Sequence, residues 1–236
     1  MAAGQFKCMP MSLVYQNEHF VIAYKPENVD FHDDSQNGNQ GFFNQTKHEL
    51  QLTELYPCHR LDKVTSGLII FAKTLNAEHA FNELFKNKNI QKIYLAISDR
   101  KPSKKQGKVA GDMEKSRNSA WRLSRSQMNP AITHFNSIAL TEGKRLFVLK
   151  PATGKTHQLR VMMKSLGSPI CGDQLYKGTE VDRVYLHAYQ LKFSLFGEDY
   201  TFSQFPNSGS WFLSLAKQTN LKSLIHEKIE LLAAKA

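Results

Sequence analysis

A polar loop that leads directly into a wholly apolar segment constrains this chain most. Residues His59–Phe71 read HRLDKVTSGLIIF, so the carboxylate of Asp62 stands just before a Gly-led run that has the length and composition of a buried strand. A carboxylate at the edge of a core must be paired, hydrogen-bonded or used in chemistry, because burying it alone is costly. We therefore expect a central strand over Gly67–Ala72 with Asp62 at a functional site beside it.

Strand and helix patterns alternate irregularly along the rest of the chain. Helical periodicity predicts helices over Leu75–Lys88 and Thr156–Leu166, the second ending at Gly167, and a C-terminal helix over about 220–234. Residues 28–45 are expected to form a loop and 47–56 a connection. Strands are predicted over the ranges 12–25 (as a pair), 91–97, 131–140, 145–151, 185–195 and 199–205. Without regular βαβ alternation, this order favours an α+β fold with a mixed, mostly antiparallel central sheet and flanking helices.

The positive charge of the chain is concentrated in one segment. The 236 residues include 31 Lys and Arg against 21 Asp and Glu, a formal net charge of +10. Residues 86–125 contain twelve basic and three acidic residues, a net charge of +9. Such a concentration favours a polyanionic partner, nucleic acid above all, over an ordinary solvated loop. We expect the basic insertion, at about 99–125, to be a flexible arm or a hairpin, with Trp121 either buried or stacked on an unpaired base.

Several classes of protein lack their signatures here. The sequence contains no GxxxxGK[ST], GxGxxG, HExxH or GxSxG, and its nine histidines have no metal-ligand spacing. Three widely separated cysteines (Cys8, Cys58 and Cys171) predict neither a disulfide framework nor a zinc site. No apolar run is long enough to span a membrane, and no signal-peptide pattern begins the chain, so we expect a cytoplasmic protein without metal or cofactor.

Four sequence blocks, in this order, resemble the RluA-type family of RNA pseudouridine synthases. They are SLVYQNEHFVIAYKP at the start, HRLDKVTSGL, KIYLAI, and TGKTHQLRVMMKSLGSPICGDQLY. The resemblance spans residues 12–205 and implies the pseudouridine synthase fold, formed by residues 1–236 as a single catalytic domain. It looks like the compact form, without the small RNA-binding domain that many relatives carry in front. Departures from the family pattern fall at Glu27-Asn28, Lys155 and Met162.

The resemblance implies a reaction and the residues for it. Such enzymes detach uracil from ribose, turn it and rejoin it through carbon, without a cofactor. The family's catalytic aspartate corresponds to Asp62, its arginine partner to Arg160, and its tyrosine to Tyr94, whose ring can stack on the base and whose hydroxyl can help remove the C5 proton. Further substrate-binding residues are expected to be Arg60 (a wedge that replaces the flipped nucleotide), Leu159 (an apolar floor), and the weaker candidates Lys92, His157 and Gln158.

The sequence leaves alternatives open. The expected partner is RNA, either transfer RNA or 23S ribosomal RNA, acted on by a monomer. One rival is a catalytically inactive RNA-binding or chaperone protein of the same fold, for which Asp62 would be dispensable. A second rival is an N-glycosidase that uses the same carboxylate to release free uracil. The joint presence of Asp62, Tyr94 and Arg160 favours the isomerase.

Overall fold

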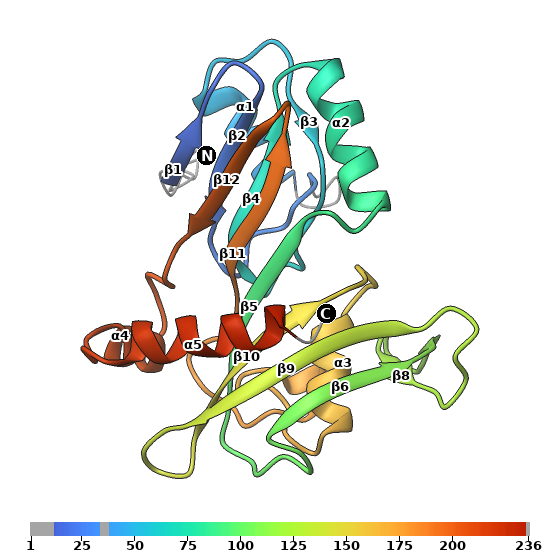
Figure 1. The fold of residues 1–236 in the computed structure, drawn as a ribbon, viewed down its shortest axis with the longest axis vertical. Helices are drawn as coiled ribbons and strands as arrows, with labels where there is room; N and C mark the ends of the chain where they lie inside the picture. The colour runs from blue at the N-terminus through green and yellow to red at the C-terminus, as the bar shows by residue number, and fades with distance from the viewer. Residues whose placement is uncertain (1–11, 34–37, 235–236) are drawn as a thin grey trace, which may run out of the picture.

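The computed structural model describes residues 12–33 and 38–234 and shows an α+β protein built on one large, bent sheet (Figure 1). The ten-stranded sheet has the order β1-β2-β4-β11-β5-β10-β9-β6, with β12 beside β11 and β3 beside β4. The pairs are antiparallel apart from β4 and β11, which run parallel. The predicted fold class, mixed and mostly antiparallel, is thereby confirmed.

The predicted strands form close to their expected positions. The strands of the large sheet are β1 (Ser12–Gln16), β2 (Phe20–Lys25), β3 (Tyr56–Pro57), β4 (Ser66–Ala72), β5 (Gln91–Ser98), β6 (Gln106–Gly111), β9 (Ala131–Ala139), β10 (Arg145–Pro151), β11 (Leu186–Leu195) and β12 (Glu198–Ser203). β2 and β4 are buried along their whole length, as their continuous apolar runs require.

Helices cover the two halves of this sheet and divide the core. They are α1 (Phe42–Glu49), α2 (Leu75–Lys86), α3 (Gln158–Ser165), α4 (Ser210–Ala216) and α5 (Leu221–Ala233), with a short 3₁₀ turn at Gln174–Tyr176. The upper half in Figure 1 packs α2 on one side of β2 and β4 and α1 on the other. The lower half packs α3, α4 and α5 against β5, β9 and β10. β5 and β11 run through both halves.

Gly67 permits the parallel contact between β4 and β11. Its φ of +123° is accessible mainly to glycine, and a Cβ there would lie 2.3 Å from the carbonyl oxygen of Ala188. Gly67 is also the register partner of Ala188. The glycine that begins the apolar run therefore lets two strands approach closely, just beyond the loop that carries Asp62.

Helix α1 corrects the prediction of a loop over 28–45 and a connection over 47–56. The helix is short, its N-cap residue is Gly41, which has no side chain to cap it, and only Phe42 and Thr46 are buried. Its position is set by tertiary contacts, such as that of Phe42 with Phe71, whose ring centroids lie 6.0 Å apart. Propensity and periodicity over so few residues carry little signal. Helix α4 was likewise not predicted.

The basic insertion is folded, which corrects the expectation of a flexible arm, whereas the expected hairpin is present. β6 pairs along its whole length with β9 at the edge of the large sheet. Beyond it, β7 (Met113–Lys115) and β8 (Trp121–Leu123) form a two-stranded hairpin. The ring of Trp121 is half-buried, with the Lys115 ammonium 6.0 Å from its centroid. The C-terminal helix, expected at about 220–234, forms as α5.

Candidate active site

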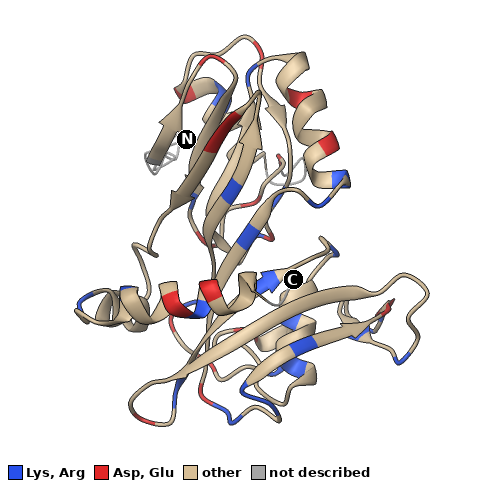
Figure 2. Ribbon diagram, viewed as in Figure 1, with Lys and Arg blue, Asp and Glu red and all other residues tan. Residues whose placement is uncertain are grey.

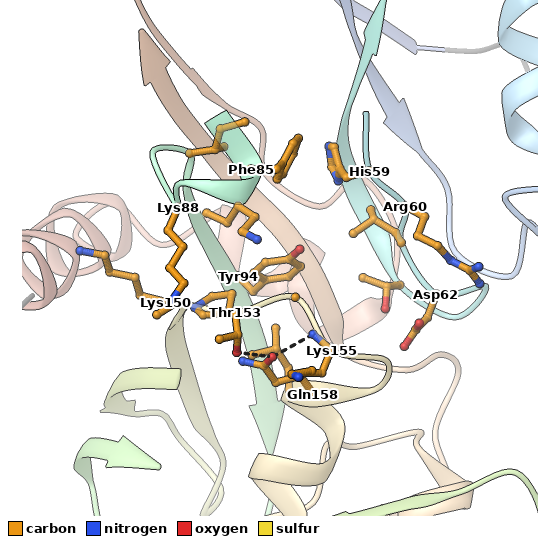
Figure 3. A pocket seen from close by; sticks show the side chains of 18 of the residues that line it. His59, Arg60, Asp62, Phe85, Lys88, Tyr94, Lys150, Thr153, Lys155 and Gln158 are labelled. Atoms are coloured by element: carbon orange, nitrogen blue, oxygen red, sulfur yellow. Dashed lines mark hydrogen bonds between the residues drawn. The ribbon is translucent and has the colours of Figure 1, made fainter. Parts of the chain in front are cut away.

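A cleft of about 750 Å³ opens between the two halves of the sheet. Its walls come from the loop before β4, the end of α2, the first half of β5, the 151–157 loop and the start of α3 (Figures 1 and 3). The cleft has two regions. The Asp62 end comprises Asp62, His157 and Arg160, and the Phe85 end comprises His59, Phe85 and Lys92. In Figure 3, Tyr94 lies below Phe85 and to the left of Asp62.

At the Asp62 end, one guanidinium joins two carboxylates. Nε and Nη2 of Arg160 donate to the Asp173 carboxylate over 2.7 and 2.8 Å, and Nη1 lies 3.5 Å from Oδ2 of Asp62. Arg160 is thus the ion-pair partner expected for Asp62, but its stronger partner is Asp173, which is almost fully buried. Burial opposes the charge on Arg160, yet the hydrogen bonds and charge of Asp173 outweigh it and raise the pKa of the guanidinium.

His157 completes this end from an unusual backbone position. It precedes α3 in the left-handed region, with φ at +55°, and its Nε2 lies 3.9 Å from Oδ2 of Asp62. Its Nδ1 is hydrogen-bonded over 2.8 Å to the hydroxyl of Tyr176, a buried residue that also accepts the backbone N–H of Trp121. Burial, followed by the Arg160 charge, lowers the pKa of His157. A neutral imidazole therefore faces Asp62 at neutral pH.

Tyr94 and Leu159 give the middle of the cleft its apolar surfaces. Tyr94 projects into the cleft from β5 (Figure 3), and burial together with the nearby Asp62 charge raises its pKa. The phenol is consequently protonated at neutral pH. Leu159 is 7% exposed, lines the cleft and also packs in the core of the lower half. Its two roles, packing and lining, coincide.

The loop that carries Asp62 is held from behind by Lys25. Although fully buried, the Lys25 ammonium donates to the carbonyls of Pro26, Lys63 and Thr65 over 2.7 to 3.0 Å. Burial lowers the pKa of Lys25 to about 7. Two of the three acceptors, Lys63 and Thr65, follow Asp62 closely in the sequence, so Lys25 fixes the backbone on the C-terminal side of the carboxylate.

Gln158 has a different role from the RNA contact that the sequence suggested. Its amide oxygen accepts from the Thr153 hydroxyl and the Lys155 N–H (Figure 3), and its amide nitrogen donates to the Ile132 carbonyl and the Thr133 hydroxyl. These four bonds use the full capacity of the side chain. Gln158 therefore ties the 153–157 loop to β9 and has no group left for a substrate.

The remaining predicted substrate residues, Arg60 and Lys92, present cations that form no ion pair within residues 12–33 and 38–234. Arg60 is exposed at the rim of the cleft. Lys92 projects from β5, two residues before Tyr94, and lies 5.5 Å from the centroid of the Phe85 ring. Burial lowers the pKa of Lys92. Both positions suit contact with a polyanion.

The charge of the cleft is strongly one-sided. Among the described residues that line it, Asp62 is the single carboxylate, against seven Lys and Arg: Arg60, Lys86, Lys88, Lys92, Lys150, Lys155 and Arg160. In the lower half of Figure 2, Lys and Arg also mark β6 and α3, whereas α5 carries both signs of charge and α2, in the upper half, carries two Glu and one Lys. An anionic ligand is therefore attracted to the cleft, where Asp62 is the one acidic group among the described lining residues.

Three residues of the site were missed by sequence reasoning: Lys25, Asp173 and Tyr176. Asp173 and Tyr176 lie in the block ICGDQLY, and Lys25 in the block YKP, both of which supported the resemblance. The available signal for Lys25 and Asp173 was a single charged residue inside each motif. The partner of such a charge can be distant in the sequence, so the motif alone does not reveal it. Lys25 binds carbonyls about forty residues away, as the separations to Lys63 and Thr65 show.

Behind the cleft, a buried polar chain links β4 to the C-terminal segment. Nη2 of Arg183 donates to the Ser66 hydroxyl over 2.7 Å, Ser66 is bonded to Nδ1 of His187 over 2.8 Å, and Nε2 of His187 to the Gln204 carbonyl over 2.8 Å. Arg183 also pairs with Glu27 at 3.0 Å. Burial lowers the pKa of His187 to about 3, so this imidazole is neutral.

Other features of the chain bear on the predictions. No cluster of metal-ligating side chains occurs within residues 12–33 and 38–234. Over the same ranges no helix is long and apolar enough to cross a membrane. Of the cysteines, Cys58 and Cys171 are free thiols whose pKa burial raises to about 12, and Cys8 lies outside the described residues.

The chain matches the sequence model of a known protein family over more than half of its length. Residues 19–165, more than half of the chain and including Asp62, Tyr94 and Arg160, match the sequence model of the RNA pseudouridylate synthase family. The chain belongs to this family, whose members are isomerases that act on RNA, and the resemblance found in the sequence blocks is thereby confirmed.

Individual relatives and structures agree with this assignment. The chain is 48% identical over 209 residues to an uncharacterized RNA pseudouridine synthase of Haemophilus influenzae, covering 87% of this chain and 92% of that protein. It is 27% identical to a ribosomal large subunit pseudouridine synthase D of Borreliella burgdorferi, covering 97% of this chain and 77% of that one. The structure of human RNA pseudouridylate synthase domain containing 1 shares the fold, with a TM-score of 0.69, 24% identity and 84% coverage of both chains.

Proposed function

We propose that this enzyme isomerises a specific uridine of structured RNA, transfer RNA or 23S ribosomal RNA, with Asp62 as its catalytic carboxylate. The observation that carries the proposal is the isolation of Asp62, the one carboxylate among seven cations on the described walls of the cleft. Arg160 directs a donor at it from 3.5 Å, and Arg160 is in turn immobilised by Asp173. A carboxylate that is charged, oriented and open to a ligand suits attack on the substrate or assistance in breaking its glycosidic bond.

The surrounding residues support the later steps. Flipping the uridine out of its helix brings the base to the cleft, with Arg60 at the rim to fill the space it leaves. The base then lies between Tyr94 and Leu159. Once uracil has turned and carbon 5 has bonded to the ribose, the C5 proton must leave. Because the raised pKa keeps Tyr94 protonated, its hydroxyl oxygen can take up the C5 proton only while its own proton passes to an acceptor, either the Asp62 carboxylate or water.

The choice of RNA is guided by relatives alone. The Borreliella burgdorferi protein and a 37% identical Rickettsia bellii protein are named for the ribosomal large subunit, the latter covering 60% of this chain and 50% of that protein. Large-subunit ribosomal RNA is accordingly the first substrate to test, followed by transfer RNA. The basic surface of the lower half supplies affinity for either. We propose action as a monomer.

Pseudouridine mapping of total RNA with and without the gene tests the proposal. We expect one or a few uridines to lose modification without the gene and to regain it with the wild-type protein but not with Asp62→Asn. Asp30→Asn is the matched control, because Asp30 is a half-exposed carboxylate that pairs over 2.6 Å with Lys63, the residue after Asp62 in the sequence. No change at any site would contradict the proposal and favour the inactive RNA-binding protein. Free uracil, detected by mass spectrometry, would indicate the N-glycosidase.

A further inference from the structure

The cleft contains a second aromatic surface that the isomerisation of one uridine does not use. At the Phe85 end, the rings of Phe85 and His59 lie 5.1 Å apart between centroids, with a tilt of 42°. Both line the cleft, and Figure 3 shows the two rings next to each other above Tyr94, with Asp62 below them on the right. Phe85 is half-buried at the end of α2, so part of its ring surface is open to the cleft.

An ammonium group without an anionic partner lies next to these rings. Nζ of Lys92 is 5.5 Å from the centroid of Phe85, and a Cβ added to Gly154 would be 3.9 Å from it. Lys92 makes no hydrogen bond or ion pair with the described part of the chain. A partly desolvated cation with no counter-ion in the protein is a site for an anion from outside.

The spacing along β5 relates this cation to the target position. Lys92 and Tyr94 are two residues apart on one strand and so face the same side, about 7 Å apart at the rise of an extended chain. Tyr94 marks the uracil. Lys92 therefore lies between the uracil and the Phe85 ring, where the phosphate joining two successive nucleotides would pass.

We infer that the Phe85 end of the cleft is a second nucleotide subsite, which binds the nucleotide next to the target uridine with its base stacked on Phe85, the edge of that base toward His59 and its linking phosphate on Lys92. The inference rests on the proposed function, because it takes the Asp62 end as the place of the target uridine. It adds that the enzyme recognises an unstacked dinucleotide rather than a single flipped base. Stacking on an aromatic ring and pairing of phosphate with lysine are both well suited to single-stranded RNA.

His59 gives this subsite a directional donor. Its Nε2 accepts the backbone N–H of Ile70 over 3.0 Å, so that nitrogen carries no proton. Burial lowers the pKa of His59 to about 3, which keeps the ring neutral and places its one proton on Nδ1. No described residue accepts this proton. The subsite therefore favours a neighbouring base that presents an acceptor, such as a carbonyl oxygen or a purine nitrogen, at its edge.

A cycle of changes in both protein and RNA tests the subsite. The RNA is a synthetic hairpin around the uridine that mapping identifies, with the base removed from the nucleotide on its 5′ or its 3′ side. We expect Phe85→Leu to lower kcat/KM roughly tenfold on intact RNA, by loss of one stacking contact. Removal of the base that occupies the subsite should lower kcat/KM of the wild-type enzyme by the same factor as Phe85→Leu does. For the Phe85→Leu enzyme, removal of that base should not lower kcat/KM any further. Phe85→Tyr should restore activity.

The chain offers a matched control in a second Phe–His pair. Phe196 and His19 lie 4.8 Å apart between ring centroids, outside the cleft, and Phe196 is 48% exposed. Phe196→Leu should leave kcat/KM unchanged. Thermal unfolding of Phe85→Leu shows whether the variant is folded, and the rescue by tyrosine separates loss of stacking from damage to α2. If the loss of kcat/KM from Phe85→Leu adds to the loss from base removal, both for the 5′ and for the 3′ neighbour, the inference is overturned.

A binding measurement separates this inference from the proposed function. Fluorescence anisotropy with labelled single-stranded hexauridylate at low salt requires no isomerisation. We expect Phe85→Leu and Lys92→Met each to weaken binding several-fold, with Phe196→Leu as control. Equal binding by wild type and both variants would overturn the subsite while leaving the proposed function intact. If the two variants bind hexauridylate more weakly but the wild-type protein isomerises no uridine, the subsite is supported and the proposed function is contradicted.

Discussion

The guanidinium of Arg160 at the Asp62 end and the ammonium of Lys92 at the Phe85 end are both desolvated cations in one cleft, but only the first has a buried anion behind it. Asp173 binds Arg160 through two hydrogen bonds, which raises the pKa of the guanidinium. Lys92 faces rings and backbone, and burial lowers its pKa. One cation is therefore part of the folded framework, whereas the other takes its anion from the ligand. Substitutions at the two ends of the cleft test that contrast.

Loss of the buried anion should affect the Asp62 end most. Asp173→Ala leaves the Arg160 guanidinium buried without its main counter-ion, which costs about 3–5 kcal/mol of unfolding free energy. Isomerisation should fall sharply as well, because Arg160 no longer has a fixed direction toward Asp62. Urea denaturation checks the stability. Asp30→Ala, which removes one partner of a surface ion pair, should cost about 0–1 kcal/mol; an equal cost for the two would refute the framework role.

The loop at the same end depends on Gln158. Gln158→Ala removes four hydrogen bonds and leaves buried groups such as the Thr133 hydroxyl without a partner. We expect a loss of about 2–3 kcal/mol in urea denaturation. Gln190→Ala, which removes one exposed side-chain bond to Ser203, is the control. If Gln158 instead bound RNA, the variant would be stable and would only bind RNA more weakly.

At the Phe85 end, His59 should make stability depend on pH. Its pKa is about 3 in the folded protein against 6.5 as the ordinary value, so the unfolded chain binds the extra proton first as pH falls. The free energy of unfolding that the neutral His59 ring preserves is fully present above pH 6.5 and is lost progressively as the pH falls toward 3. Between pH 6.5 and 4 the loss is about 2 kcal/mol, allowing for partial exposure of the ring.

His59→Gln isolates that contribution, because a glutamine oxygen can still accept the Ile70 N–H. Urea denaturation of wild type and variant at pH 6.5 and 4 gives the comparison, in which the contributions of other titrating groups cancel. The wild-type protein should lose about 2 kcal/mol more than the variant over this range. Parallel pH dependences would show that His59 is not held neutral by the fold.

Removal of the unpaired cation should have the smallest effect on stability, and of the opposite sign. Lys92→Met keeps the stem of the side chain but removes a charge that has lost water without gaining a partner. We expect a gain of about 1 kcal/mol, or roughly 2–4 °C in Tm, in the free protein. RNA binding should weaken, and its salt dependence should fall by about one phosphate contact. A destabilised Lys92→Met protein would mean that Lys92 is structural, like Arg160.

Elements with strong local patterns were predictable from the sequence, whereas those set by distant contacts were not. The apolar runs of β2 and β4 and the long faces of α2 and α5 gave their positions almost to the residue. Helix α1 was missed because it is short and is held by contacts of Phe42 with Phe71. β6 was missed as a sheet strand because its polar, glycine-containing sequence forms an edge by pairing with β9.

The residues of the site show the same difference between local patterns and distant contacts. Motif resemblance located Asp62, Tyr94 and Arg160, and the structure brings all three to one cleft, where their catalytic roles stay a prediction. It could not locate the residues that hold these three in place, because pairs such as Arg160 with Asp173 or Lys25 with the Thr65 carbonyl depend on tertiary geometry. Gln158 was a weaker candidate for RNA contact, named for its place in the block that resembles the family. Only the bonds that it makes within the protein reveal that it is fully occupied.

The polar chain from Arg183 through Ser66 and His187 to Gln204 has a fixed direction. The Gln204 carbonyl can only accept and the Arg183 guanidinium can only donate, so with a neutral His187 each proton between them has a single allowed position. Ser66 must donate to Nδ1, and Nε2–H must point to Gln204. All the bond dipoles in this chain therefore point the same way, and no rearrangement of protons can reverse them. The wall behind the cleft thus carries a permanent electrical polarity, which neutron diffraction would show as ordered hydrogens on Ser66 and His187.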